Sequence, residues 1–240
     1  YSAAGQYGFL RTHIGNLPPE SQWGFDRVPS GWREYWNSEE SFVDGNFDNV
    51  LLTAGNFIQG NPPSQNYDAG GTVSPLEVTI DIFEWVVDQN TDIKLYIYEN
   101  WETMSRAHIS DFPPTEDQIA LYHLNNSLQG EFHQWWLDYH DGILLEVPGV
   151  KMIPVGPILS NLLSGILSGI PVDVLYEDTA PHGRPTTYFL AAMITYMAMN
   201  QVDVPETYDV PESIHSLVSD NYDQIAEVIW AQLQSFNFPN

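Results

Sequence analysis

The sequence has no cysteine among its 240 residues, which excludes disulfide bonds and thiol-based catalysis in this chain. Cationic side chains are scarce: Lys and Arg together number 7 against 32 Asp and Glu, and the formal net charge is −25. A chain of this charge repels phosphate backbones, so we expect no nucleic-acid partner. The scattered acidic residues fit either a salt-adapted surface, as in marine or halophilic bacteria, or an ordinary acidic secreted protein.

Long apolar runs are also missing. No stretch reaches the roughly 18 uninterrupted apolar residues of a membrane-spanning helix, and we expect the longest run, 188–199, to be a buried helix. The chain begins with Tyr1, and no charged region followed by an apolar one comes after it, so we expect a mature or trimmed protein. These features predict no membrane partner and a secreted or periplasmic location in a bacterium.

Known cofactor motifs are absent as well. The spacing of His133 and His140 does not suit a metal-binding helix face, and neither a His-Glu-x-x-His motif nor a glycine-rich phosphate or dinucleotide loop occurs. Asp44-Gly-Asn46-Phe-Asp48 resembles the start of a calcium loop but lacks the glycine and the distal glutamate of that motif. We expect no metal ligands and no cofactor, with calcium as the alternative.

The residues that are present predict a folded α/β chain. Apolar residues make up 43% and aromatic residues 13%, which is typical of a globular protein. Apolar periodicity and capping signals predict strands at 49–54, 93–98 and 150–155 and helices at 75–89, 116–145 with a break near Gly130, 157–167, 184–199 and 211–236. This alternation predicts a mostly parallel sheet in a three-layer α/β/α, flavodoxin-like arrangement. We expect a single domain over 1–240, with an irregular Trp-rich segment at about 9–48.

Polar and aromatic residues directly follow the second predicted strand. Glu99, Asn100 and Trp101 come at its carboxyl end, where parallel sheets place their binding sites. We expect these three residues to line the substrate cleft. Trp101, with Trp135 and Trp136, has the ring surface to stack on sugars, although tryptophans are more often buried in the core.

One histidine lies in a setting that suits general base catalysis. The acidic pair Glu177-Asp178 precedes His182, which lies in a Pro/Gly-rich turn just before an apolar helix. A carboxylate beside a histidine orients the imidazole and stabilises its charged form. A solvated or purely structural histidine is an equally good interpretation of the pattern.

Two glycine turns carry candidate oxyanion donors. Gly55-Asn56 follows the first predicted strand, where an amide group could face a developing negative charge. Ser2 to Gly8 could form a short strand that enters a glycine turn, where Gly8 could offer its main-chain N–H group. For both, an ordinary turn that needs a positive φ is the favoured alternative.

Taken in chain order, Gly8, Gly55-Asn56 and Asp178 to His182 resemble blocks of the SGNH (GDSL-type) hydrolase superfamily. Its members are α/β/α esterases and lipases, including carbohydrate deacetylases, with a serine nucleophile, Gly and Asn oxyanion donors, and an Asp-x-x-His motif. The resemblance implies that Asn56 and Gly8 are oxyanion donors and that His182 is the base. The helix expected after His182 is similar to the one that follows the family's histidine.

The chain departs from the family pattern at two points. No Gly-x-Ser-Leu nucleophile block occurs, and Thr179 stands three residues before His182, so Asp178 or Glu177 must orient the imidazole. We expect a secreted serine esterase acting on a carbohydrate or small ester, with acetylated polysaccharide as the substrate class.

The alternative is an inactive SGNH-fold protein for carbohydrate binding or surface assembly. Whether the chain is an enzyme depends on its nucleophile, and a homo-oligomer is left open. A polysaccharide lyase is less favoured, because few cations are present to neutralise a uronate.

Overall fold

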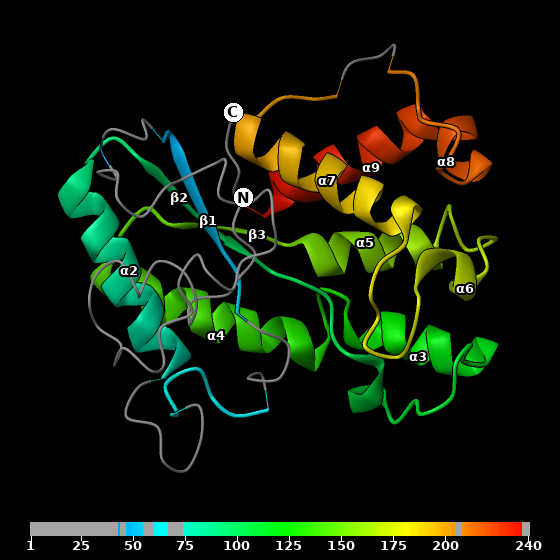
Figure 1. Cartoon of the computed structure of the whole chain (residues 1–240), viewed down its shortest axis with the longest axis horizontal. Coiled ribbons are helices and arrows are strands. Elements are labelled where there is room, and N and C mark those ends of the chain that lie inside the picture. The colour runs from blue at the N-terminus through cyan, green and yellow to red at the C-terminus, as the bar shows by residue number, and fades with distance from the viewer. Residues whose placement is uncertain (1–42, 44–46, 55–59, 67–73, 205–207, 237–240) are drawn as a thin grey trace, which may run out of the picture. The chain divides into compact units, whose positions relative to one another are not determined.

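The computed structural model describes residues 43, 47–54, 60–66, 74–204 and 208–236. Along the chain they form β1 (Asn49–Leu52), α2 (Pro75–Gln89), β2 (Lys94–Tyr98), the 3-10 helix η4 (Met104–Ala107), α3 (Glu116–Asn125), α4 (Glu131–Glu146), β3 (Lys151–Ile153), α5 (Val155–Ser164), α6 (Val172–Leu175), α7 (Pro185–Asn200), α8 (Ser216–Asp220) and α9 (Tyr222–Ser235) (Figure 1). Contacts group the chain into two compact units, Tyr1–Tyr98 with Trp135–Met152 and Glu99–Gln134 with Ile153–Asn240. The expectation of a single domain stays a prediction.

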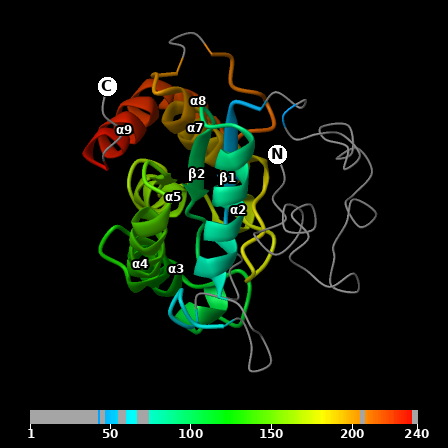
Figure 2. The ribbon, with the colours of Figure 1, turned by 90° about the vertical axis from the view of Figure 1, so that its left-hand side faces the viewer.

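The strands form a small parallel three-stranded sheet in the order β1-β2-β3. β1 and β2 lie side by side, with Asn49 opposite Lys94 and Leu52 opposite Ile97 (Figure 2). A parallel pair needs a crossover connection, and α2 lies in the connection between these strands. The described residues therefore form an α/β fold, which is compatible with the predicted three-layer α/β/α arrangement.

Helix α2 of the first unit begins where its sequence predicts. Ser74 is the N-cap: its Oγ accepts a hydrogen bond from the Glu77 main chain at 3.1 Å, and Glu77 Oε2 accepts one from the Ser74 main chain at 2.8 Å. This capping box satisfies two amide groups that the helix leaves unpaired, and Pro75 suits the first turn. The buried face of α2 carries Val78, Ile82, Phe83 and Val86 at helical spacing.

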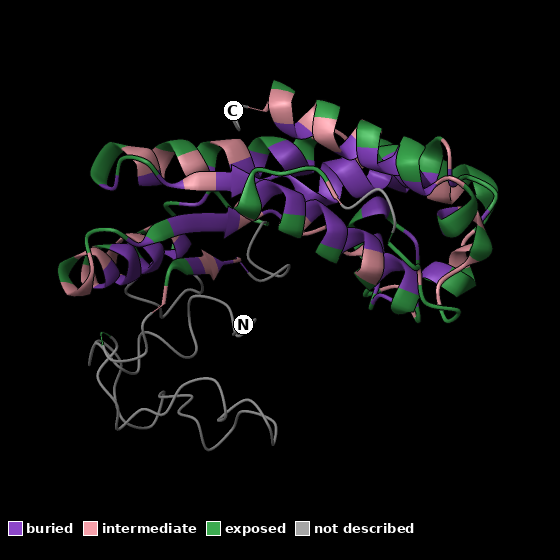
Figure 3. Cartoon of the chain, turned by 90° about the horizontal axis from the view of Figure 1, so that it is seen from above, coloured by how far each residue is buried: buried purple, intermediate pink, exposed green. Residues whose placement is uncertain are grey.

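Helix α5 forms the centre of the second unit. It packs against α3, α7 and α9, and Figure 1 shows α3 on one side of it and α7 with α9 on the other. Eight of its residues are buried, as expected for a helix covered on several sides. Helices α7 and α9 also carry exposed residues between the buried ones, as the colours of Figure 3 show.

The structure confirms one predicted helix break and corrects another prediction. α3 and α4 are separated at Gly130, where a side chain would collide with the Asn125 carbonyl group. The helix expected at 211–236 is instead α8 and α9, preceded by a turn in which the Ile214 amide donates to the Pro211 carbonyl oxygen. Asn221 divides the two helices, because its side chain bonds back to the Leu217 carbonyl oxygen at 2.8 Å.

Of the irregular segment expected at 9–48, only residues 43, 47 and 48 are among those described. Across the described ranges, none of the helices combines the length and apolar character needed to cross a membrane.

Candidate active site

A short loop between α6 and α7 carries His182. Tyr176 pairs with Gly183 in an antiparallel bridge, and the Glu177 amide donates to the His182 carbonyl oxygen at 2.8 Å. The loop is thus closed at its base, immediately before Pro185 begins α7. This local pairing holds His182 in one place although its side chain is 64% exposed.

Asp178 and His182 form a hydrogen-bonded pair. His182 Nδ1 lies 2.7 Å from Asp178 Oδ2, while Asp178 Oδ1 accepts from the amides of Ala180 at 2.9 Å and His182 at 3.3 Å. The bond from His182, helped by these amides, lowers the pKa of Asp178. A carboxylate on Nδ1 places the hydrogen there and leaves Nε2 as the basic nitrogen. Asp178 therefore bonds the imidazole, whereas Glu177 contributes only its main chain to His182.

The segment after β2 contacts this loop. Trp101 Nε1 donates to the Pro181 carbonyl oxygen at 3.0 Å, and the Met104 amide donates to the Thr179 carbonyl oxygen at 2.9 Å. Trp101, expected to contact substrate, thus lies beside His182. Asn100, from the same expected group, is half-buried.

Glu99 directly follows β2, where the sequence predicts a residue that lines the substrate cleft. It is fully buried, and its Oε1 lies 2.8 Å from His133 Nδ1, another buried group. Its Oε2 has no hydrogen-bond partner, and the Phe236 ring packs on His133 with the ring centroids 5.5 Å apart. Burial is the main cause that raises the pKa of Glu99, to about 7, against the opposing effect of His133. Its predicted substrate contact stays untested.

The remaining predicted residues fall into two groups. The oxyanion candidates Gly8 and Asn56 lie outside the described residues, as do Asp44 and Asn46 of the calcium-like stretch. Trp135 and Trp136 are buried, which agrees with the core alternative for both. Within the described ranges no three His, Asp or Glu side chains gather in a way that could hold a metal ion.

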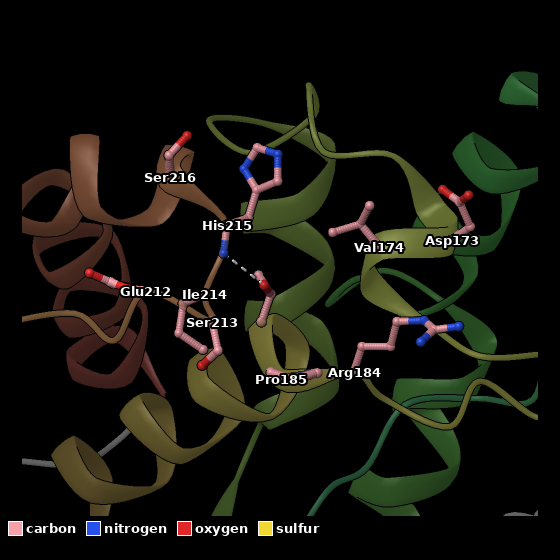
Figure 4. Close-up of a pocket in the computed structure, with 10 residues that line it drawn as sticks. Asp173, Val174, Arg184, Pro185, Glu212, Ser213, Ile214, His215 and Ser216 are labelled. Carbon is pink, nitrogen blue, oxygen red and sulfur yellow. Dashed lines mark hydrogen bonds between the residues drawn. The ribbon is translucent and has the colours of Figure 1, made fainter.

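A pocket that the sequence did not indicate lies at the start of α7 (Figure 4). Its volume is about 580 Å³, and α6, the start of α7 and the segment leading into α8 supply the lining residues Asp173, Val174, Arg184, Pro185, Thr186, Glu212, Ser213, Ile214, His215 and Ser216. A hydrogen bond of 3.0 Å from the His215 amide to Thr186 Oγ1 joins two of these segments. The lining mixes acidic and basic groups, so it favours no single ligand charge.

Comparison of the chain with protein-family models, curated proteins and solved structures found no match. The class of this protein therefore follows from its own fold and site. It is an α/β protein that carries a solvent-exposed Asp–His pair just before a helix.

Proposed function

We propose that this chain is an ester hydrolase of the SGNH type, in which His182 is the general base and Asp178 orients it. The observation that carries the proposal is the 2.7 Å bond between Asp178 Oδ2 and His182 Nδ1. This bond gives the imidazole a fixed tautomer and leaves Nε2 for a substrate-side proton. The exposure of His182 makes that nitrogen accessible.

In the proposed reaction, a serine hydroxyl loses its proton to His182 Nε2 while its oxygen attacks the ester carbonyl carbon. The carbon–oxygen π electrons move to the carbonyl oxygen, which by resemblance would be bound by Asn56 and Gly8. The carboxylate of Asp178 stabilises the imidazolium. His182 then returns the proton to the leaving alcohol oxygen as the ester bond breaks, and water releases the acyl group by the same sequence.

The proposal does not assign the nucleophile to a particular serine of this chain. In the described part of the chain, no hydrogen bond joins His182 to a serine. The exposed side chain of Glu177 and the carboxylate of Asp178 flank the loop, and their charge disfavours an anionic ester. These features support an ester on a neutral carbohydrate, such as an acetylated polysaccharide.

The second candidate is a carbohydrate-binding or surface-assembly protein of the same fold without catalysis. The lack of a serine bonded to His182 among the described residues favours it. It predicts glycan binding without any reactive serine.

Fluorophosphonate labelling followed by peptide mass spectrometry of the natural, full-length protein tests the proposal. We expect one adduct on one serine, loss of that adduct in His182→Ala, and slower labelling in Asp178→Asn. His108→Asn is the matched control, because His108 is exposed and has a φ of 59°, which asparagine tolerates. Absence of an adduct, together with no hydrolysis of p-nitrophenyl acetate, rejects the hydrolase and leaves the second candidate.

A further inference from the structure

Two aromatic rings lie against the residues on either side of His182. The Trp101 indole is bonded to the carbonyl oxygen of Pro181, the residue before His182. The Tyr188 ring lies over Gly183, the residue after it, since a Cβ built on Gly183 would be 3.1 Å from Tyr188 Cζ. The rings are themselves neighbours, with centroids 6.3 Å apart and planes inclined at 51°.

Each ring is positioned by its surroundings. The bond to Pro181 fixes the Trp101 indole, and the missing side chain of Gly183 leaves room for Tyr188. Tyr188 nevertheless remains 53% exposed, and among the other described aromatic side chains only those of Tyr196 and Tyr208, each 48% exposed, are similarly open to solvent. An exposed aromatic surface beside a reactive group is a feature of ligand sites rather than of a core.

The two aromatic rings and the nearby carboxylate favour a neutral sugar as the ligand. Tyrosine and tryptophan each present an apolar ring face and a polar tip, which together match the C–H face and the hydroxyl groups of a sugar. The Asp178 carboxylate, four residues before His182, disfavours an anionic ligand. An acyl chain gains binding free energy from each methylene group that it buries. It would therefore need a longer apolar surface than these two rings provide.

We infer that Trp101 and Tyr188 form a platform that binds a sugar ring of a neutral glycan directly beside His182. The inference rests on the proposed function in taking the His182 loop as the place where the substrate lies. It adds a specificity residue, Tyr188, whose ring would lie 3.1 Å from a side-chain carbon at position 183. The platform itself requires neither the nucleophile nor the charge state of His182.

Calorimetric titration of the full chain with xylohexaose, mannohexaose, cellohexaose and hexagalacturonate tests the inference. We expect at least one neutral hexaose to bind, with affinity reduced about fivefold or more in Tyr188→Ala through loss of the ring contact. Tyr188→Phe keeps the ring and should retain binding to within about twofold. Tyr196→Ala is the matched control, because Tyr196 lies on the same helix and is 48% exposed.

The outcomes are separable from those of the hydrolase test. Binding of a neutral glycan that is lost in Tyr188→Ala but kept in Tyr196→Ala supports the platform, whether or not any serine is labelled. The inference is overturned if no neutral hexaose binds, if hexagalacturonate binds more tightly than all of them, or if Tyr196→Ala is as damaging as Tyr188→Ala. Circular dichroism of each variant shows that a lost affinity is not a lost fold.

Discussion

The indole nitrogen of Trp101 donates a hydrogen bond of 3.0 Å to the carbonyl oxygen of Pro181, although the two residues are 80 positions apart in the chain. Thr179, in the same loop as Pro181, accepts a second bond from the Met104 amide. The segment after β2 therefore holds the loop that carries His182. The position of the candidate base depends on residues distant in sequence, and this dependence can be tested.

Replacing Trp101 with Phe removes the indole donor and keeps an aromatic ring. We expect amide hydrogen exchange in the loop around His182 to become faster and the free energy of unfolding to fall by about 1 kcal/mol, the usual net value of one hydrogen bond. Trp135→Phe is the control, because Trp135 Nε1 also donates to a carbonyl oxygen, that of Asn61. Equal acceleration of loop exchange in both variants would contradict the proposed link.

Local signals were enough to predict much of the secondary structure. The predicted start of α2 at residue 75 is confirmed, and it depends on Ser74, Pro75 and Glu77, which all lie within one helical turn. The boundary between α8 and α9 was missed, since the apolar periodicity continues through Asn221. The break there depends on a side-chain bond to Leu217 that a periodic pattern does not encode.

The candidate site divides in the same way. Asp178 and His182 are four residues apart, so their pairing could be expected from sequence, and the choice of Asp178 over Glu177 needed only the loop geometry. The pair of Glu99 with His133 joins residues 34 positions apart, one directly after β2 and the other on α4. Such a contact follows from tertiary packing, and no short motif indicates it.

The carboxylate of Asp178 predicts a defined acid response. Its pKa is lowered by the bond from His182, so the stabilisation is fully present above the unfolded value of 3.8 and is lost as the pH falls through the lower folded value. We expect Asp178→Asn to flatten the dependence of the free energy of unfolding on pH in this acid range. The variant should therefore lose less stability than the unaltered chain when the pH is lowered. Urea unfolding from about pH 2 to about pH 5 measures the slope. An unchanged slope would show that the pair contributes nothing to folding.

The buried carboxyl of Glu99 predicts a dependence of stability on pH with the opposite sign, that is, stability that falls as the pH rises. Burial raises its pKa from 4.5 to about 7, so the folded chain binds this proton more tightly than the unfolded chain does. Its contribution to stability is present below pH 4.5 and is lost as the pH rises through about 7. We expect the free energy of unfolding to fall by on the order of 2–3 kcal/mol between about pH 5 and about pH 8.

The variant Glu99→Gln should largely remove this decline, because glutamine does not titrate. Glu84→Gln, which changes an exposed carboxyl on α2, should leave the decline in place. Guanidinium unfolding monitored by tryptophan fluorescence at several pH values compares the two. A decline that persists in Glu99→Gln would assign the effect to another group.

Gly156, near the start of α5, lies where the packing leaves no room for a side chain, and replacing it with alanine tests this. Its amide donates to the Glu99 carbonyl oxygen at 3.1 Å, and a side-chain carbon at this position would collide with the Asn100 carbonyl oxygen. Because the colliding atom belongs to the main chain, it cannot rotate away, and the 99–101 segment itself would have to shift. We expect Gly156→Ala to lower the free energy of unfolding by about 2–3 kcal/mol.

The same shift should reach the loop of His182, since Trp101 follows Asn100 directly and is bonded to Pro181. Gly156→Ala should therefore also speed amide exchange around residues 178–182, as Trp101→Phe does. Gly60→Ala is the control, because a Cβ there meets no atom within 4 Å. Denaturant unfolding combined with hydrogen exchange measures both effects, and a destabilised Gly156→Ala with an unaltered loop would mean that the 99–101 segment does not position His182.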